Sequence, residues 1–106
     1  METTLACVTH KELMKMLERE IERRLVTEVK HRGGICLKQN GLVGIPDRLV
    51  LLQHGRMAFV ELKAPGKKPR EIQEFRMKQL QELGFRCYVI DNAQTVGGIL
   101  DEIQSA

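Results

Sequence analysis

Three charged residues stand at the ends of two neighbouring apolar segments in the middle of the chain. Asp47 precedes the first segment, residues 48–52, and Glu61 and Lys63 close the second, which starts at Met57. Two carboxylates can hold a hard cation such as Mg²⁺, which prefers oxygen ligands and retains water. A cation held there makes water easier to deprotonate and stabilises charge on a phosphate. A nearby lysine could orient the water or neutralise the developing charge, so these residues indicate metal-dependent hydrolysis of a phosphate ester.

A β-hairpin would bring the three residues together. Residues 47–52 and 57–63 have the composition of strands, and His54-Gly55-Arg56 between them is typical of a turn. With that turn, Leu49 would oppose Glu61. Because side chains alternate along a strand, Asp47 and Glu61 would then be diagonal neighbours on one face, about 7–8 Å apart at Cα. A different turn length would change this register.

Each of the three residues also has a simpler explanation. Glu61 and Lys63 could form an ordinary surface pair on a strand, and an aspartate after a proline, as at Asp47, is usually a turn residue. Their joint placement on one hairpin favours a functional site.

A helix before the hairpin is expected to add a third carboxylate. Glu18 falls inside the apolar arc of this helix, where a carboxylate is costly unless it is paired or bound to a cation. It could reach the same metal site, directly or through water, or it could pair with an arginine at the margin of the core. Glu22 lies at the edge of the same arc, so the choice between the two glutamates stays open.

The hydrophobic pattern predicts an α/β fold, a mixed sheet with helices on its faces. In the first helix Thr9 and Glu12 have the spacing of a capping box, and Gly33-Gly34 ends the helix. In the second helix five residues are expected to point inward, namely Ile72, Phe75, Met77, Leu80 and Leu83. The expected order is α-β-β-β-α-β-α, with a helix from Thr9 to Gly33, strands at 35–37, 47–52 and 57–63, a helix at 70–83, a strand at 85–90 and a last helix after Asp91-Asn92.

The ordered set of motifs resembles a known nuclease signature. Gly44-Ile45-Pro46-Asp47, followed after one hairpin by Glu61-Leu62-Lys63, looks like the PD-(D/E)xK pattern. More closely, the chain resembles the virus-type replication-repair nuclease (VRR-NUC) domain in its short, stand-alone phage or bacterial form. Further matching positions over nearly the whole chain are Glu18, Ile21-Glu22, Gly33-Gly34, Gln73, Leu80, Gly84 and Tyr88-Val89-Ile90.

The resemblance implies a restriction-endonuclease-like fold and cleavage of DNA that depends on Mg²⁺ or Mn²⁺. By this likeness Asp47 and Glu61 are metal ligands, the backbone carbonyl of Leu62 is a further ligand, and Lys63 acts on the water or the phosphate. In the same way Glu18 is the helix carboxylate among the ligands, and Gln73 is a residue that supports the catalytic site. Stand-alone members of the family are associated with homodimers that act on branched DNA such as four-way (Holliday) junctions.

The composition sets the scale of the molecule. With 106 residues and 42% hydrophobic residues, we expect one domain over residues 10–106, preceded by a flexible tail over residues 1–9. Three cysteines without a CxxC pair favour a reducing cytoplasm, here of a bacterial or phage-infected cell. No apolar run approaches the roughly 20 residues of a membrane span.

The charge balance permits a nucleic-acid partner. Lysine and arginine exceed aspartate and glutamate by 17 to 14, which gives a net charge of +3. Lys67, Lys68 and Arg70 follow the proposed site directly, and they could contact DNA phosphates without reading sequence. Taken singly, each of them fits a solvated loop better. One tyrosine, three phenylalanines and no tryptophan argue against a module that stacks single-stranded bases.

The leading hypothesis is therefore a metal-dependent DNA endonuclease, a homodimer that cuts branched DNA. Two alternatives remain. One is a DNA-binding module of the same fold without catalytic activity, which the intact Asp47, Glu61 and Lys63 disfavour. The other is a nickase or exonuclease with the same active site, which the sequence does not distinguish from the endonuclease of the leading hypothesis.

Overall fold

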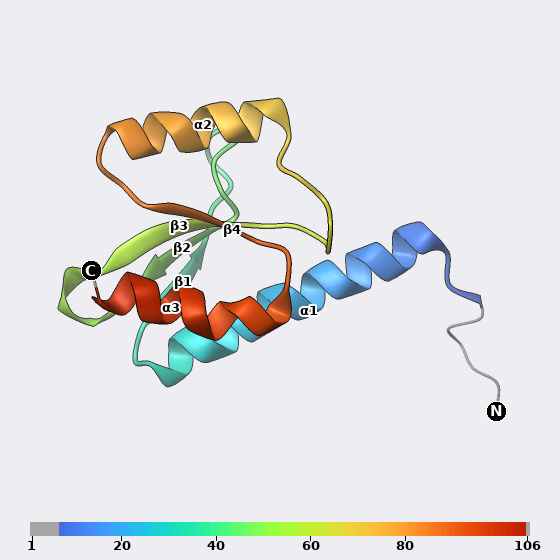
Figure 1. The fold of residues 1–106 in the computed structure, drawn as a ribbon, viewed down its shortest axis with the longest axis horizontal. Helices are drawn as coiled ribbons and strands as arrows, with labels where there is room; N and C mark the ends of the chain where they lie inside the picture. The colour runs from blue at the N-terminus through green and yellow to red at the C-terminus, as the bar shows by residue number, and fades with distance from the viewer. Residues whose placement is uncertain (1–6, 106) are drawn as a thin grey trace.

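The computed structural model describes residues 7–105, and its centre is a four-stranded mixed sheet (Figure 1). The strands lie in chain order, with β1, β2 and β3 antiparallel and β4 parallel to β3. The elements are α1 (His10–His31), β1 (Ile35–Lys38), β2 (Arg48–Leu51), η2 (Gln53–Gly55), β3 (Met57–Leu62), α2 (Glu71–Glu82), β4 (Cys87–Ile90), η3 (Ala93–Thr95) and α3 (Val96–Ser105). The predicted fold class and element order are confirmed, with two short 3₁₀ turns added.

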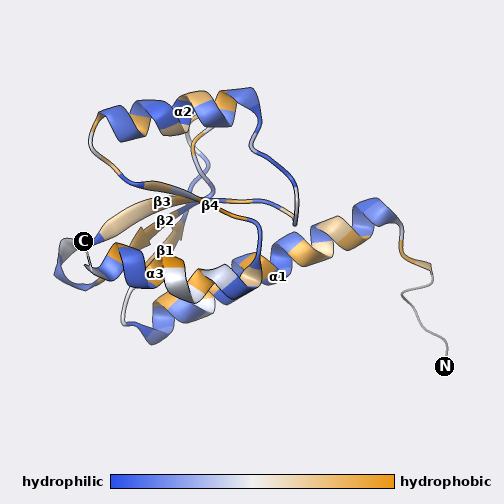
Figure 2. Ribbon diagram, viewed as in Figure 1, coloured by the Kyte–Doolittle hydropathy of each residue, from blue (hydrophilic) through white to orange (hydrophobic). Residues whose placement is uncertain are grey.

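Helices cover the two faces of the sheet unequally. In Figure 1, α1 and α3 lie under one face and α2 lies over the other. The core sits on the α1 and α3 side, where side chains at alternating β3 positions, Ala58, Val60 and Leu62, are buried against both helices. Figure 2 shows hydrophobic positions of α1 and α3 along the side that meets the sheet. No helix among residues 7–105 is both long and apolar enough to cross a membrane.

The first helix begins and ends as its sequence predicts. Thr9 Oγ1 accepts the backbone N–H of Glu12 at 3.1 Å, and the Glu12 carboxylate accepts the backbone N–H of Thr9 at 3.0 Å, which completes the capping box. Gly33 has a φ of +77° just after the last turn, a conformation that glycine adopts without strain. Of the predicted tail, residues 1–6 lie outside the described part of the chain, and so does residue 106 at the other end.

The fully buried residues of α1 all lie in its second half. Ile21, Leu25 and Val29 are its buried residues, one helical turn apart. The first half projects past the sheet, and its apolar residues Leu13 and Leu17 are half-buried (Figure 1). The first half of α1, residues 10–20, is therefore an exposed arm next to the loop that follows β3.

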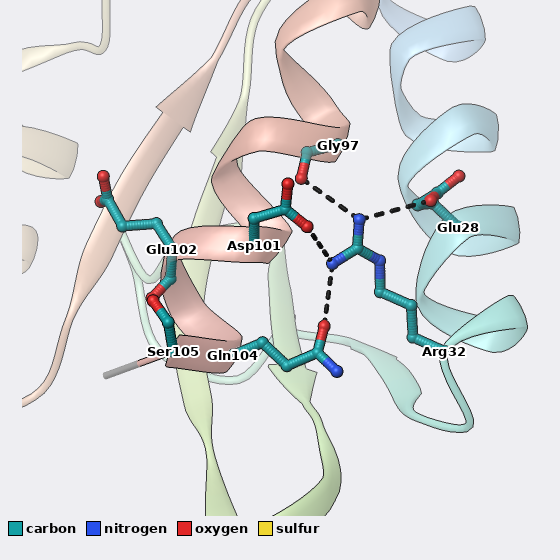
Figure 3. A network of polar contacts seen from close by, with 7 residues as sticks. All are labelled: Glu28, Arg32, Gly97, Asp101, Glu102, Gln104 and Ser105. Carbon is teal, nitrogen blue, oxygen red and sulfur yellow. Dashed lines mark hydrogen bonds and ion pairs between the residues drawn. The ribbon is translucent and has the colours of Figure 1, made fainter.

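Arg32 fixes the other end of α1 to α3 (Figure 3). Its Nη1 donates to Asp101 and to Gln104, each at 2.8 Å, and its Nη2 donates to the carbonyl of Gly97 at 3.2 Å. Glu28, one turn back on α1, pairs with the same guanidinium at 3.5 Å. This network joins the C-terminal end of α1 to α3, at the end of the helix opposite the arm.

The hairpin register differs from the prediction by two residues. The turn is formed by Gln53–Gly55 and not by the triplet that starts at His54, so Leu49 pairs with Phe59 and not with Glu61. The physical reason is local, since His54 and Gly55 both adopt positive φ values, 65° and 73°, and the chain reverses one residue earlier. Continuing the observed register by one residue from Arg48↔Val60 places Asp47 directly opposite Glu61 instead of diagonal to it.

The predicted inward face of α2 was wrong at two of its five positions. Met77 is buried and Ile72 and Leu80 are half-buried, but Phe75 is 59% exposed and Leu83 is 69% exposed. The other buried residue of α2 is polar, Gln73, one turn before Met77. The helix contacts the sheet along a narrow strip, so an apolar side chain off that strip stays in solvent.

Candidate active site

The loop before Asp47 lies close against α2, and this contact positions Asp47. Gly44 has a φ of +82°, and a Cβ at this position would lie 2.7 Å from the backbone oxygen of Ile72. Only glycine fits this conformation and this distance, and the loop then continues into the buried Pro46. The carboxylate of Asp47 accepts the backbone N–H of Leu62 at 2.9 Å, and the backbone oxygen of Asp47 accepts the N–H of Gln39 at 2.8 Å. Asp47 is therefore held from both neighbouring strands.

Glu61 is a buried carboxylate with one bonded oxygen and one bare oxygen. The residue is 1% exposed, and its Oε2 lies 3.2 Å from the Lys63 ammonium. Oε1 is buried without a hydrogen-bond partner among the described residues. Burial raises the pKa of the Glu61 carboxyl, and the neighbouring Asp47 carboxylate raises it further, whereas Lys63 opposes the rise. This arrangement costs free energy in the protein alone, because a buried charged oxygen lacks a partner.

The residues around the bare oxygen fit a divalent cation. A cation between Glu61 and Asp47 would give Oε1 a partner and would remove the repulsion between the two carboxylates. Mg²⁺ binds commonly through one or two carboxylates and keeps several waters. Within residues 7–105, no three side chains of histidine, cysteine, aspartate or glutamate gather into a metal-binding group. The protein side of the site is thus a carboxylate pair.

Glu18 does not gather with Asp47 and Glu61 into one group of metal-binding side chains among residues 7–105. It lies on the arm of α1 and lines a cleft of about 350 Å³ that also contains Lys63. A role for Glu18 at the metal, directly or through water, remains a prediction.

The alternative helix carboxylate, Glu22, is already paired. Arg48 donates to its Oε2 from Nε at 2.9 Å and from Nη2 at 2.7 Å, and donates from Nη1 to the Cys36 carbonyl at 3.2 Å. Arg48 points to the α1 face, away from Asp47, as strand alternation predicts. This pair joins α1 to β2 through Glu22, whereas Glu18 has no ion pair with another residue of the described range 7–105.

Comparison with known proteins gives the family of the chain. No protein-family model matches the chain. It is 43% identical over 88 residues to "Putative nuclease p44" of Acyrthosiphon pisum secondary endosymbiont phage 1, a match that covers 81% of this chain and 94% of that protein. A solved structure of a VRR_NUC domain superposes with a TM-score of 0.71 at 25% identity, over 79% of this chain and 94% of the other. This chain belongs to the VRR-NUC nuclease family.

The remaining predicted residues of the VRR-NUC chain separate into two groups. Gln73 is 7% exposed, and its amide oxygen accepts the backbone N–H of Arg70 at 2.8 Å. This hydrogen bond caps the first turn of α2. Lys67 and Lys68 line the cleft that contains Lys63, whereas Arg70 stands at the N-cap of α2 and does not line it. The predicted basic patch is therefore divided between the cleft and the start of a helix.

Two lysines of the cleft were not predicted as site residues. Lys11 and Lys15, on the arm of α1, face the loop lysines across the cleft. The signal was present in the sequence, because residues 11, 15 and 18 recur at four- and three-residue spacing and so share one helix face with Glu18.

The variant Glu61→Gln tests the cost of the bare oxygen in the metal-free protein. The pKa of Glu61 is raised on folding, so its contribution to stability is complete below the ordinary value of 4.5 and is lost as the pH rises through the raised pKa. We expect Glu61→Gln to gain stability over the wild type as the pH rises through the raised pKa, by an amount on the order of 1 kcal/mol, the cost of a buried polar group without a partner.

Urea unfolding at several pH values, with a chelator present, measures this difference. Glu82→Gln, on the exposed end of α2, is the matched control and should leave stability nearly unchanged at every pH. A difference between wild type and Glu61→Gln that does not vary with pH would contradict the interpretation.

Proposed function

We propose that this VRR-NUC protein is a DNA endonuclease that depends on Mg²⁺ or Mn²⁺, cuts branched DNA such as four-way junctions, and acts as a homodimer in the cytoplasm of a bacterial or phage-infected cell. The observation that supports the metal most strongly is the bare buried oxygen of Glu61, next to the Asp47 carboxylate and 3.2 Å from Oε2 to the Lys63 ammonium. The family supports a nuclease.

In this proposal Asp47 and Glu61 hold the cation, with the backbone carbonyl of Leu62 as a further oxygen ligand. When bound, the cation lowers the pKa of a water ligand and neutralises charge on the phosphate. The bond from Leu62 N–H to Asp47 keeps that carboxylate fixed before any ligand arrives. The burial of Glu61 excludes competing water from its side of the site, which strengthens its interaction with a charged group.

Lys63 is the positively charged side chain that the protein itself contributes to the candidate active site. Its side chain is 16% exposed, so the ammonium is accessible from the cleft while it stays paired to Glu61. From this place Lys63 orients the attacking water or neutralises charge on the phosphate oxygens, which adds to the electrostatic stabilisation of the transition state.

The alternative of an inert DNA-binding module fits the same residues less well. Cationic side chains are enough to bind a phosphate backbone, and a buried carboxylate with a bare oxygen is not needed for it. In a module that only binds DNA, such a carboxylate would lower stability without contributing to binding. A nickase or exonuclease would use the same Asp47, Glu61 and Lys63, and it differs from the proposal only in its products.

The exposed apolar surface supports association with a second copy. Ile35 and Leu37 lie on β1, an edge strand of the sheet, and are 58% and 41% exposed. Other large apolar side chains on the surface are Met16, Leu42, Val43, Phe75, Leu83, Phe85 and Val89. Small domains bury a modest share of their surface on folding, so a symmetric dimer would cover apolar area that one chain leaves in water and would supply two active sites.

Cleavage of four-way, flapped and linear DNA, with and without Mg²⁺, tests the nuclease proposal. We expect cleavage that needs Mg²⁺ and favours the four-way junction. Asp47→Ala and Glu61→Ala should each slow it by about a thousandfold, the loss of several kcal/mol of charge stabilisation. Lys63→Ala should slow it by about a hundredfold.

Glu82→Gln controls for the loss of a carboxylate away from the site. Cleavage by Asp47→Ala and Glu61→Ala at the wild-type rate would refute the site assignment. Equal cutting of junction and linear duplex would refute the preference for branched DNA and would leave the nuclease intact. Release of single nucleotides from ends would favour the exonuclease alternative.

Light scattering of the purified protein at micromolar concentration tests the homodimer. The expected mass is twice the 12.1 kDa of one chain. A mass of one chain over the whole micromolar range would contradict the dimer, and with it the idea of paired incisions by two joined sites.

A further inference from the structure

The cleft beside the candidate active site has two walls that come from distant parts of the sequence. One wall is the projecting arm of α1, and the other is the loop after β3, which turns toward that arm (Figure 1). The charged side chains that line the cleft are Lys11, Lys15 and Glu18 from the helix and Lys63, Lys67 and Lys68 from β3 and its loop. Its volume is about 350 Å³.

The charge of the cleft is strongly positive. Five lysines line it against a single carboxylate, that of Glu18. Lys63 pairs with Glu61, and the other four lysines form no ion pair with a carboxylate of residues 7–105. The net charge of the whole chain is only +3, so the positive charge is concentrated here. Such a concentration attracts a polyanion.

Both walls are held in place before a ligand arrives. The loop wall is fixed by a bond from the Gly66 N–H to Asp91 at 3.4 Å, and by the Lys67 N–H, which donates to the Ala64 carbonyl at 3.0 Å. The helix wall is ordered to its first turn by the capping box of Thr9 and Glu12. Preformed walls reduce the entropy that binding costs.

The lining indicates which part of a nucleic acid the cleft would take. Among the described residues its lining includes no Phe, Tyr or Trp, and His10 is its one ring, so it offers little surface on which bases could stack. Lysine ammonium groups are point charges that suit phosphate oxygens. Lys11 and Lys15 are one helical turn apart, with Cβ atoms about 5–6 Å from each other, so the two can reach neighbouring phosphates of one strand.

We propose that this cleft binds the phosphate backbone of the DNA strand that continues from the cleaved bond. Lys11 and Lys15 hold the strand from the α1 side, opposite Lys67 and Lys68, and act as positioning residues. Because Lys63 lines the cleft and also pairs with Glu61, a strand in the cleft leads directly to the candidate active site. The inference rests on the proposed function for its ligand. The lysines of α1 then contact the strand in addition to the loop lysines, and these contacts do not depend on sequence.

Binding without metal tests the cleft separately from cleavage. Labelled single strands, duplexes and four-way junctions of two unrelated sequences are titrated in the presence of a chelator at several salt concentrations. We expect the double variant Lys11→Ala/Lys15→Ala to bind every probe about tenfold more weakly at moderate salt, with the salt slope reduced by about two. Both positions are exposed and helical, where alanine is well tolerated.

The matched control is Lys30→Ala/Lys78→Ala, which removes the same charge from exposed positions outside the cleft. It should change affinity less than the cleft variant and keep the wild-type salt slope. Equal slopes for both double variants, or no binding by the wild type at low salt, overturn the cleft proposal. Loss of binding in the cleft variant without any cleavage by the wild type overturns the proposed nuclease activity and leaves the cleft in place.

Discussion

The structure depends on one unfavourable interaction, the burial of the Glu61 carboxylate beside that of Asp47 with one oxygen left without a partner. A fold tolerates such a group only where the surroundings hold it, and in the proposed function a bound cation would offset its cost. Here Asp47 is tied to the Leu62 backbone, Lys63 covers the other oxygen of Glu61, and Gly44 lets the preceding loop press against α2. The hairpin thereby brings together the two carboxylates that would hold the cation in the proposed function.

Most of the fold follows from local signals that act within one element. The capping box at Thr9, the glycine after α1 and the alternating apolar strands are local, and their predicted elements are present in the predicted order. The hairpin register was missed because it depends on the backbone of His54 and Gly55, both with positive φ. The error was two residues, an even number, so Asp47 and Glu61 still share one face of the sheet.

The choice of partners could not be predicted, because it is settled by tertiary packing. Glu22 and Glu18 are one turn apart on α1 and look alike in sequence, but Arg48 from β2 reaches only Glu22. Similarly, Phe75 belongs to the apolar pattern of α2, but that helix contacts the sheet along a strip that runs through Gln73 and Met77. Helix periodicity indicates which side of a helix faces the sheet, but it does not indicate how far around the helix the buried surface extends.

The charges of the chain divide between two adjoining places, with carboxylates at the end of the hairpin and lysines in the cleft beside it. A cation site at the carboxylates is the central claim, and diffraction from crystals soaked in Mn²⁺ tests it most directly, because Mn²⁺ scatters anomalously. We expect one anomalous peak within about 2.5 Å of a carboxylate oxygen from both Asp47 and Glu61. A peak elsewhere in the molecule, with Oε1 of Glu61 still without a partner, would contradict the claim.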